Sequence, residues 1–288
     1  MSFHMKNRPA RRALQAAFVS LFALVASVAH AEWGLNMTEG VSILSKEIYG
    51  LHMEIFWWCV GIGVVVFGVM IYSLIKFRKS QGAQADTTLV HSTKVEIVWT
   101  VIPIMILVAM AVPTARGLIK IEDMGNVALN IKVTGYQWKW EYEYLNQGVS
   151  FFSTLKADSN AARQLGSGVD PATVPNYLLD VDNVLVIPAG TKIRFLLTAQ
   201  DVIHAWWVPA FGMKKDAIPG YVNEIWVQVD ADKIGTYRGL CAELCGQDHG
   251  FMPIVVEVKS PADYDVWLRA KQAEQKLAGT ASPTALVQ

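Results

Sequence analysis

The sequence predicts a two-helix transmembrane hairpin followed by an all-β sandwich, and three observations predict this class. Of the 288 residues, 52% are hydrophobic and only 17% are charged, which favours a membrane protein over a soluble enzyme. Two uncharged apolar stretches are each long enough to cross a bilayer. The rest of the chain has short segments rich in Val, Ile, Tyr and Trp, separated by turn residues, as in a β-sandwich.

The first 31 residues predict a secretory signal peptide that is cleaved. A basic stretch ending at Arg12 precedes an apolar run over residues 13–28, and residues 29–31 read Ala-His-Ala, a typical cleavage site. The mature chain then begins at Glu32. The alternative is a third, retained membrane helix, but the short apolar run and the small residues after it favour a signal peptide.

Residues 32–118 predict an N-terminal segment and two membrane spans, over about 53–76 and 95–117. The centres of these spans contain no charged residue. The loop between them carries four Lys and Arg residues against one Asp, so the positive-inside rule places it in the cytoplasm. Both ends of the mature chain then lie on the periplasmic side of a bacterial inner membrane, which agrees with the signal peptide.

Residues 119–269 predict a periplasmic all-β domain. Its strand-like segments are Leu129–Thr134, Gln137–Tyr144, Tyr177–Ile187, Lys192–Leu197, Tyr221–Val229 and Pro253–Val258. Asn160–Pro175 predicts an irregular insertion between them. Residues 270–288 begin with a helical pattern and run into Gly, Thr, Ser and Pro, which predicts a flexible C-terminal tail.

Acidic residues exceed basic ones in the extramembrane domain. Residues 120–269 contain 18 Asp and Glu against 13 Lys and Arg. A negative domain suits a positively charged protein partner. It argues against nucleic acid, because phosphates need a basic face.

One short segment concentrates metal-binding side chains. Cys241, Cys245, His249 and Met252 supply two thiolates, an imidazole and a thioether, which are ligands that favour copper. The only other His after residue 91 is His204. A lone His near a strand end is more often structural, but here one of the two remaining His lies in a Cys/Met loop. The sequence therefore predicts that both His bind metal.

Three alternatives compete with a two-copper site. A disulfide between Cys241 and Cys245 leaves His249 and Met252 unexplained. A thioether is a poor ligand for zinc. A mononuclear blue copper site uses a single Cys. Two coppers bridged by both Cys residues use every donor, with Met252 and a loop carbonyl as the weaker ligands.

The surroundings of the metal motif resemble the cytochrome c oxidase subunit II family. The resemblance runs from about Glu47 to Trp267 and implies a cupredoxin-like Greek-key sandwich behind the hairpin, with a binuclear CuA centre. It implies the electron-entry subunit of a bacterial haem-copper oxidase. The segments that carry it are the copper motif, Tyr136-Gln-Trp-Lys-Trp, Asp201-Val-Ile-His-Ala-Trp-Trp-Val-Pro, Asp216-Ala-Ile-Pro-Gly and Phe251-Met-Pro-Ile.

The resemblance also implies a role for individual residues. Glu243 matches a carboxylate on a Mg or Mn ion shared with subunit I, and Trp138 matches the residue through which electrons enter from cytochrome c. Glu96 matches the mouth of a proton pathway, and Asp182 and Asp201 match acids that dock cytochrome c. The implied copper ligands are His204, Cys241, the carbonyl of Glu243, Cys245, His249 and Met252. Without the resemblance, Trp138 is expected in the core and Glu243 is expected to be a solvated loop acid. Glu96 is then an interfacial acid that caps a helix, and Asp182 and Asp201 are ordinary carboxylates at strand ends.

Such a subunit accepts electrons at CuA and passes them to haem in subunit I, where oxygen is reduced to water and protons are translocated. The implied partners are subunit I, subunit III, cytochrome c and the lipid bilayer. No Cys-x-x-Cys-His occurs, so the chain itself is expected to bind no haem. Two departures from the family pattern are Tyr221, where many members have Arg, and Gln200, where some have an acid.

Three other functions are alternatives to the predicted oxidase subunit. A nitrous oxide reductase carries this copper motif but is soluble and needs a large second copper domain, which two spans and six His argue against. A quinol oxidase subunit II lacks copper, whereas Cys241, Cys245 and His249 are intact here. A membrane-tethered copper carrier favours exposed Met-rich runs, and only three Met residues follow residue 115.

Overall fold

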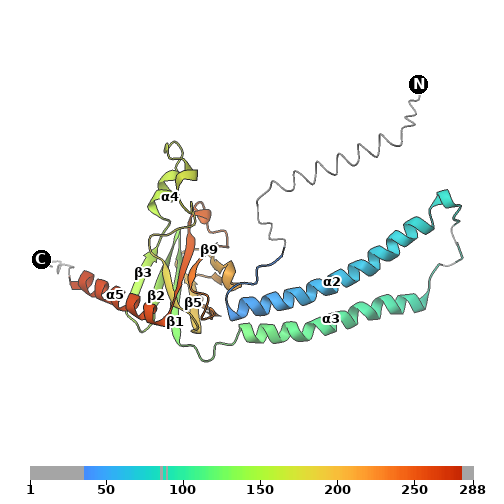
Figure 1. Cartoon of the computed structure of the whole chain (residues 1–288), viewed down its shortest axis with the longest axis horizontal. Coiled ribbons are helices and arrows are strands. Elements are labelled where there is room, and N and C mark those ends of the chain that lie inside the picture. Colours follow the sequence, from blue (N-terminus) through green and yellow to red (C-terminus); the bar gives the residue numbers. More distant parts are fainter. Residues whose placement is uncertain (1–35, 85–86, 89, 281–288) are drawn as a thin grey trace, which may run out of the picture. The chain divides into compact units, whose positions relative to one another are not determined.

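The computed structural model describes residues 36–84, 87, 88 and 90–280 (Figure 1). The signal peptide predicted over residues 1–31 lies outside the described residues and stays a prediction. Within the described part, two long α-helices come first, ten β-strands follow, and a further α-helix comes last.

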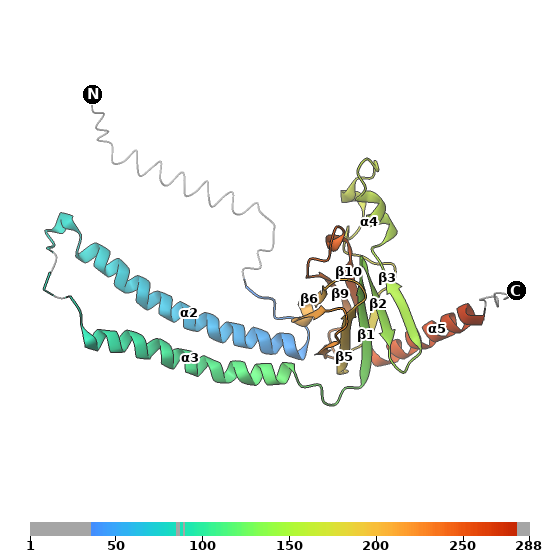
Figure 2. The ribbon, with the colours of Figure 1, turned by 180° about the vertical axis from the view of Figure 1, so that it is seen from behind.

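Helices α2 (Ile43–Lys76) and α3 (Thr93–Ile121) lie side by side (Figure 1, Figure 2) and contain the two predicted spans. Both are long and apolar enough to cross a membrane, and their most apolar windows contain no buried residue. These side chains are therefore available to lipid or to partner subunits. Gly117 allows the two helices to approach closely, because a Cβ there would lie 2.7 Å from Leu51 Cδ1.

Helix α2 begins ahead of the span that was expected from about residue 53. A capping box starts it, because the N–H of Ser45 donates to Ser42 Oγ and the N–H of Ser42 donates to Ser45 Oγ, each at 2.9 Å. Ser42 Oγ also donates to the carbonyl of Phe211, at 2.8 Å. The polar start of the helix is thus held by the β-domain, while only its later part is apolar.

The ten strands form two five-stranded sheets with the orders β3-β2-β1-β5-β8 and β4-β10-β9-β6-β7. The pairs β1–β5 and β10–β4 are parallel, and the other pairs are antiparallel. The predicted hairpin followed by a β-sandwich is confirmed. The strands are β1 (Leu129–Tyr136), β2 (Lys139–Tyr144), β3 (Val149–Ser153), β4 (Leu185–Pro188), β5 (Ile193–Ala199), β6 (His204–Val208), β7 (Met213–Ala217), β8 (Asn223–Val227), β9 (Gly235–Cys241) and β10 (Pro253–Lys259).

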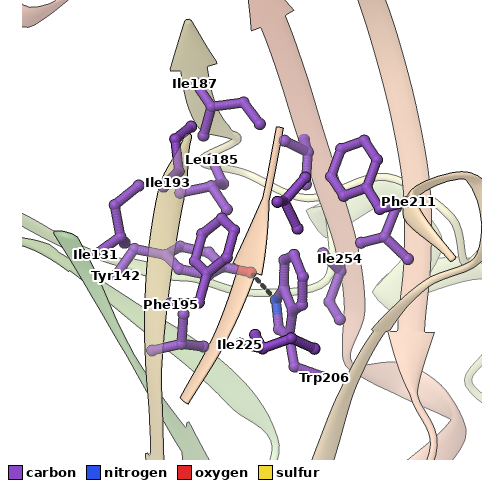
Figure 3. Packing of buried hydrophobic residues seen from close by; sticks show 14 of the residues in the cluster. Ile131, Tyr142, Leu185, Ile187, Ile193, Phe195, Trp206, Phe211, Ile225 and Ile254 are labelled. Atoms are coloured by element: carbon purple, nitrogen blue, oxygen red, sulfur yellow. Dashed lines mark hydrogen bonds between the residues drawn. The ribbon is translucent and has the colours of Figure 1, made fainter. Parts of the chain in front are cut away.

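Aromatic and aliphatic side chains fill the space between the sheets (Figure 3). The rings of Phe195 on β5 and Trp206 on β6 lie 4.9 Å apart between centroids, and both are fully buried. The Nε1–H of Trp206 donates to the hydroxyl of Tyr142 at 3.4 Å, so the buried indole has a polar partner. Burial of a side chain such as Phe contributes about 1.5–3 kcal/mol. This core fixes β6, whose first residue is His204.

Two predicted segments differ from the observed strands. Of Tyr177–Ile187, only the last part becomes β4, because Asn176 and Leu178 take φ angles of 50° and 62° and turn the chain. The insertion expected at Asn160–Pro175 contains the end of a short helix, α4 (Ala157–Ala162). Its remainder is formed by turns and a single turn of 3-10 helix.

Helix α5 (Pro261–Thr280) continues past the boundary at residue 269, so the tail expected to be flexible from residue 270 is helical as far as Thr280. The amide of Gln272 donates to the carbonyl of Gln147 at 2.7 Å. The ring of Trp267 lies 5.3 Å from that of Tyr144. These contacts hold the helix against the sandwich, which a helical pattern alone could not predict.

Candidate metal centre

Two neighbouring strands and one loop bring the predicted ligands together. His204 is the first residue of β6 and Cys241 is the last residue of β9, and these strands pair so that Trp206 faces Cys241. The loop after β9 carries the other ligands and ends at Met252, immediately before β10. Strand pairing therefore joins two segments that are distant in sequence.

The two thiols lie at the centre of the site. Cys241 Sγ and Cys245 Sγ are 3.8 Å apart, and their residues are 1% and 2% exposed. A disulfide bond is about 2.05 Å long, and both thiols are free. The two thiols are not joined by a disulfide in this structure, and both sulfurs are available as ligands.

The remaining donors divide between the two sulfurs. Cys241 Sγ lies 3.9 Å from His204 Nδ1 and 3.4 Å from the carbonyl oxygen of Glu243. Cys245 Sγ lies 3.5 Å from His249 Nδ1 and 3.5 Å from Met252 Sδ. Each thiol thus has one imidazole and one weaker donor. This set fits a pair of copper ions, because thiolate, imidazole and thioether suit copper and no donor is left over.

The ring orientation of His204 is set by Asp201. Asp201 Oδ1 accepts a hydrogen bond from His204 Nε2–H at 2.9 Å. The other ring nitrogen, Nδ1, therefore faces the sulfur of Cys241. The other carboxylate oxygen of Asp201 accepts from the N–H of Gln137 at 2.7 Å. Burial acts to raise the pKa of Asp201, but the hydrogen bonds from His204 and from backbone amides outweigh it and hold that pKa below its usual range.

Sequence reasoning assigned Asp201 only to a docking surface and missed its contact with His204. The spacing of three residues between the acid and the His was the available signal. The carboxylate of Asp182 likewise has local partners, because it accepts from Thr154 N at 2.7 Å and from Thr154 Oγ1 at 2.8 Å. Asp182 is exposed, and its docking role stays a prediction.

The pKa values of the two thiols are shifted in opposite directions. Burial acts to raise the pKa of Cys241, but hydrogen bonds with His204, with backbone groups of Glu243 and Ala205 and with His249 together outweigh it and lower that pKa. Burial and the negative charge of Cys241 both raise the pKa of Cys245. The second thiolate is therefore hard to form without a cation, which is how a site behaves when metal replaces the protons.

Trp138 lies directly against the thiol loop. Its residue is half-buried, and its Nε1–H donates to the carbonyl of Cys245 at 3.1 Å. The side-chain amide of Gln137 donates to the same carbonyl at 2.9 Å. Gly246 makes room for the indole, because a Cβ there would lie 3.1 Å from Trp138 Cζ2. The structure thus places an indole that is partly open to solvent one hydrogen bond from a predicted copper ligand.

The back of the site is closed by aromatic and glycine residues. Trp140 is fully buried, its Nε1–H donates to the carbonyl of Met252 at 3.3 Å, and its ring lies 5.8 Å from that of His204. A Cβ on Gly135 would lie 2.8 Å from the His204 ring. Sequence reasoning noted Trp140 only within an aromatic motif and assigned neither residue to the metal site, because their contacts with it arise from the pairing of distant strands.

The other two predicted acids lie apart from these contacts. The side chain of Glu243 is exposed, although its carbonyl reaches Cys241. Glu96 lies in the first turn of α3, and its N–H donates to the carbonyl of Ser92 at 3.0 Å. Their roles toward a shared cation and a proton pathway stay predictions.

Replacing Asp201 by Asn is expected to weaken copper binding by about 10–100-fold, the usual cost of losing a partner that orients a metal ligand. His204 and the N–H of Gln137 contact different carboxylate oxygens of Asp201, and in Asn one of these two positions is an NH2 group that cannot accept a hydrogen bond. Competition with a chelator measures the affinity. Asp182→Asn is the matched control and should bind copper as tightly as the parent. Equal affinities for the parent and both variants would contradict this role of Asp201.

Two family models match the chain. The model of the cytochrome C oxidase subunit II periplasmic domain matches residues 129–259, and the model of the subunit II transmembrane domain matches residues 30–116. The first range contains both segments that bear the ligands. The second contains most of the two long helices.

Individual proteins are similar over most of the chain. The "Probable cytochrome c oxidase subunit 2" of Rickettsia bellii is 40% identical over 240 residues, covering 83% of this chain and 84% of that protein. Cytochrome c oxidase subunit 2 of Arabidopsis thaliana is 36% identical over 237 residues, covering 82% and 88%. A solved structure, the periplasmic domain of subunit II of cytochrome oxidase of Bradyrhizobium japonicum, is 37% identical, with a TM-score of 0.44 and coverage of 53% and 99%.

Proposed function

The chain belongs to the cytochrome c oxidase subunit II family, and from this premise we propose that it is the electron-entry subunit of a bacterial haem-copper oxidase. It accepts electrons from cytochrome c and passes them to haem in subunit I. Oxygen is reduced to water there, and protons are translocated. The chain contributes the metal centre and the entry surface to this reaction.

The observation that supports this proposal most strongly is the division of donors between two buried thiols. The residues that would hold copper are His204, Cys241, Glu243 through its carbonyl, Cys245, His249 and Met252. A bound copper pair would supply a carrier of single electrons. Because the ligands are held by strand pairing, by Asp201 and by Trp140, they need move little when the charge changes.

The burial of these donors argues against a copper carrier. His204, Cys241, Cys245 and Met252 are each at most 2% exposed. A carrier hands its ion to a partner and needs ligands that the partner can reach. A centre that retains its metal and exchanges only electrons is served better by buried ligands.

Trp138 is the proposed entry point for electrons. Its indole is half-buried and donates to the carbonyl of Cys245. An electron arriving at the ring therefore reaches a thiolate ligand through one hydrogen bond and a few covalent bonds. The excess of acidic residues in this domain, Asp182 and Asp201 among them, favours approach of a positively charged cytochrome c.

The remaining assignments concern the assembled oxidase. We propose that the exposed Glu243 carboxylate binds a Mg or Mn ion shared with subunit I, that subunits I and III contact the chain in the bilayer, and that the chain binds neither haem nor nucleic acid. The orientation follows the positive loop between the helices, with the copper domain and both termini in the periplasm. We propose that residues 1–31 are a cleaved signal peptide and that residues 119–269 are the copper domain.

Glu96 at the start of α3 is proposed as the mouth of a proton pathway into subunit I. Glu96→Gln is expected to slow steady-state oxygen consumption several-fold and to leave the copper spectrum unchanged, because it removes a proton acceptor far in sequence from the ligands. Glu54→Gln on α2 is the control and should turn over as the parent does. A parent-like rate in Glu96→Gln would remove Glu96 from the pathway.

The test of the proposed function is a copper count and a paramagnetic resonance spectrum of the full chain, purified within its oxidase. Two coppers per chain in this subunit, with one unpaired electron shared between both nuclei, would support the proposal. One copper per chain, or an electron localised on a single nucleus, would contradict it and favour a mononuclear site.

A further inference from the structure

The side chain of Arg163 joins the insertion before β4 to the loop after β9, residues 242–252, which is called the copper loop below. Arg163 follows α4, and its Nη1 and Nη2 lie 3.1 Å and 2.9 Å from the two carboxylate oxygens of Asp248. The two side chains are 19% and 23% exposed. This fork of two parallel hydrogen bonds between charged groups gives a directional and comparatively strong contact.

The other faces of the Arg163 guanidinium are also engaged. Its Nε donates to Asn160 Oδ1 at 2.7 Å, which fixes the group from the side of the insertion. Its central carbon lies 4.2 Å above the ring of Phe251, in a cation–π arrangement. The guanidinium therefore contacts two residues of the copper loop at once.

Those two contacts lie beside the predicted ligands. Asp248 immediately precedes His249, and Phe251 immediately precedes Met252. The three residues His249–Phe251 form the 3-10 turn η4, which is closed by the N–H of Phe251 donating to the carbonyl of Asp248 at 2.9 Å. Arg163 thus bridges both ends of the turn that presents one imidazole and the thioether to Cys245.

We propose that Arg163 is a positioning residue for the metal centre: it holds the turn of His249–Phe251 in its ligand-presenting geometry before metal arrives. This inference rests on the proposed function for the identity of the metal, but the ordering of the turn does not depend on it. The reason is entropic. A turn already fixed by the fork and by the cation–π contact loses less freedom when its side chains bind metal.

A second ion pair, between β9 and the segment that follows the insertion, provides a matched control. Arg238 on β9 donates through Nη2 to Asp180 Oδ1 at 2.8 Å, with side chains 35% and 19% exposed. Asp180 also accepts from Asn176 at 3.1 Å. Among the interactions of the described residues, neither Arg238 nor Asp180 contacts a predicted copper donor. Loss of this pair removes an ion pair without removing the contacts of Arg163 with Asp248 and Phe251.

The first experiment uses the metal-free full chain in detergent and measures amide hydrogen exchange across the copper loop. Arg163→Gln should accelerate exchange at the N–H of Phe251, because the turn loses its brace. Arg163→Lys keeps the charge but not the fork, so it should give an intermediate rate. Arg238→Gln should leave that amide as in the parent. Equal exchange in the parent and Arg163→Gln would overturn the inference, whatever metal the site binds.

The second experiment uses the copper-loaded oxidase and measures the rate at which a chelator removes copper, together with the paramagnetic resonance spectrum. Arg163→Gln should lose copper about 10–100-fold faster, and its spectrum should change at the His249 ligand. The double variant Arg163→Gln/Asp248→Asn should lose copper no faster than Arg163→Gln, because both changes break one contact. Additive losses would overturn the inference.

The outcomes separate this inference from the proposed function. A parent chain without a copper pair would contradict the proposed function. The exchange measurement would still test whether Arg163 holds the turn of His249–Phe251. A parent with a normal copper pair, combined with identical behaviour of Arg163→Gln and Arg238→Gln, would contradict the positioning role of Arg163 and leave the proposed function intact.

Discussion

Cys245→Ser is expected to abolish the two-copper centre and to lower cytochrome c oxidation by at least about 100-fold. Loss of a partner that only orients a ligand already costs about 10–100-fold, and Cys245 is itself a proposed ligand at the centre of the site. Its sulfur lies within 3.8 Å of the sulfur of Cys241 and at 3.5 Å from both His249 and Met252. Copper analysis and steady-state oxidation of reduced cytochrome c measure the two effects.

Cys59→Ser is the matched control for this prediction. Cys59 is an exposed free cysteine on α2, in one of the two candidate membrane spans. Its replacement should leave both the copper content and the rate unchanged. Retention of two coppers in Cys245→Ser would show that the second thiol is not a bridging ligand.

Trp138→Ala is expected to keep both coppers and to slow electron entry from cytochrome c by about tenfold or more, which corresponds to about 1.4 kcal/mol in the barrier. The indole is the half-buried ring that donates to the carbonyl of Cys245. Its removal takes away both the contact for the donor and the hydrogen-bonded route to the ligand. Stopped-flow reduction of the copper centre by reduced cytochrome c measures the rate.

Two controls separate electron entry from damage to the site. A small inorganic reductant should reduce the centre of Trp138→Ala at the parent rate, because it needs no docked ring. Trp138→Phe retains an aromatic ring without the Nε1 donor. Comparison of its rate of reduction with that of Trp138→Ala therefore separates the contribution of the ring from that of the hydrogen bond. Normal reduction of Trp138→Ala by cytochrome c would exclude Trp138 as the entry point.

The parts of the fold that depend on local pattern could be predicted from the sequence. The membrane spans have continuous apolar stretches, and Trp140, Tyr142 and Tyr144 alternate as β2 requires, with all three buried. The start of α2 could not be predicted in this way. Ser42 caps the helix within a polar stretch and is held by Phe211, which is 169 residues away.

Strands that are buried on both faces were harder to predict. The strand β6 reads His-Ala-Trp-Trp-Val and shows no simple alternation, because most of it is buried. The segment from Tyr177 fails as a strand for a backbone reason, since Leu178 adopts a left-handed φ that β-sheet excludes. Neither property is visible in local hydrophobicity.

The cluster of candidate ligands was easier to predict than the residues that support it. The thiols, His249 and Met252 are close in sequence, and His204 was the one remaining His after residue 91. The contacts of Gln137 with Asp201 and of Arg163 with Asp248 join residues separated by 64 and 85 positions. Such pairs become neighbours only through the tertiary fold, so one sequence without its structure gives no sign of them.

The register between β6 and β9 also sets an order of biogenesis. Four of the donors share one loop, but His204 lies 37 positions before Cys241 and reaches it only when these two strands have paired. A nascent, unfolded chain therefore offers copper an incomplete chelate. Under the proposed function, the complete site would therefore bind copper only after the two strands have paired. A metal held by all of these donors would bind the folded chain more tightly than the unfolded one and would stabilise the folded domain.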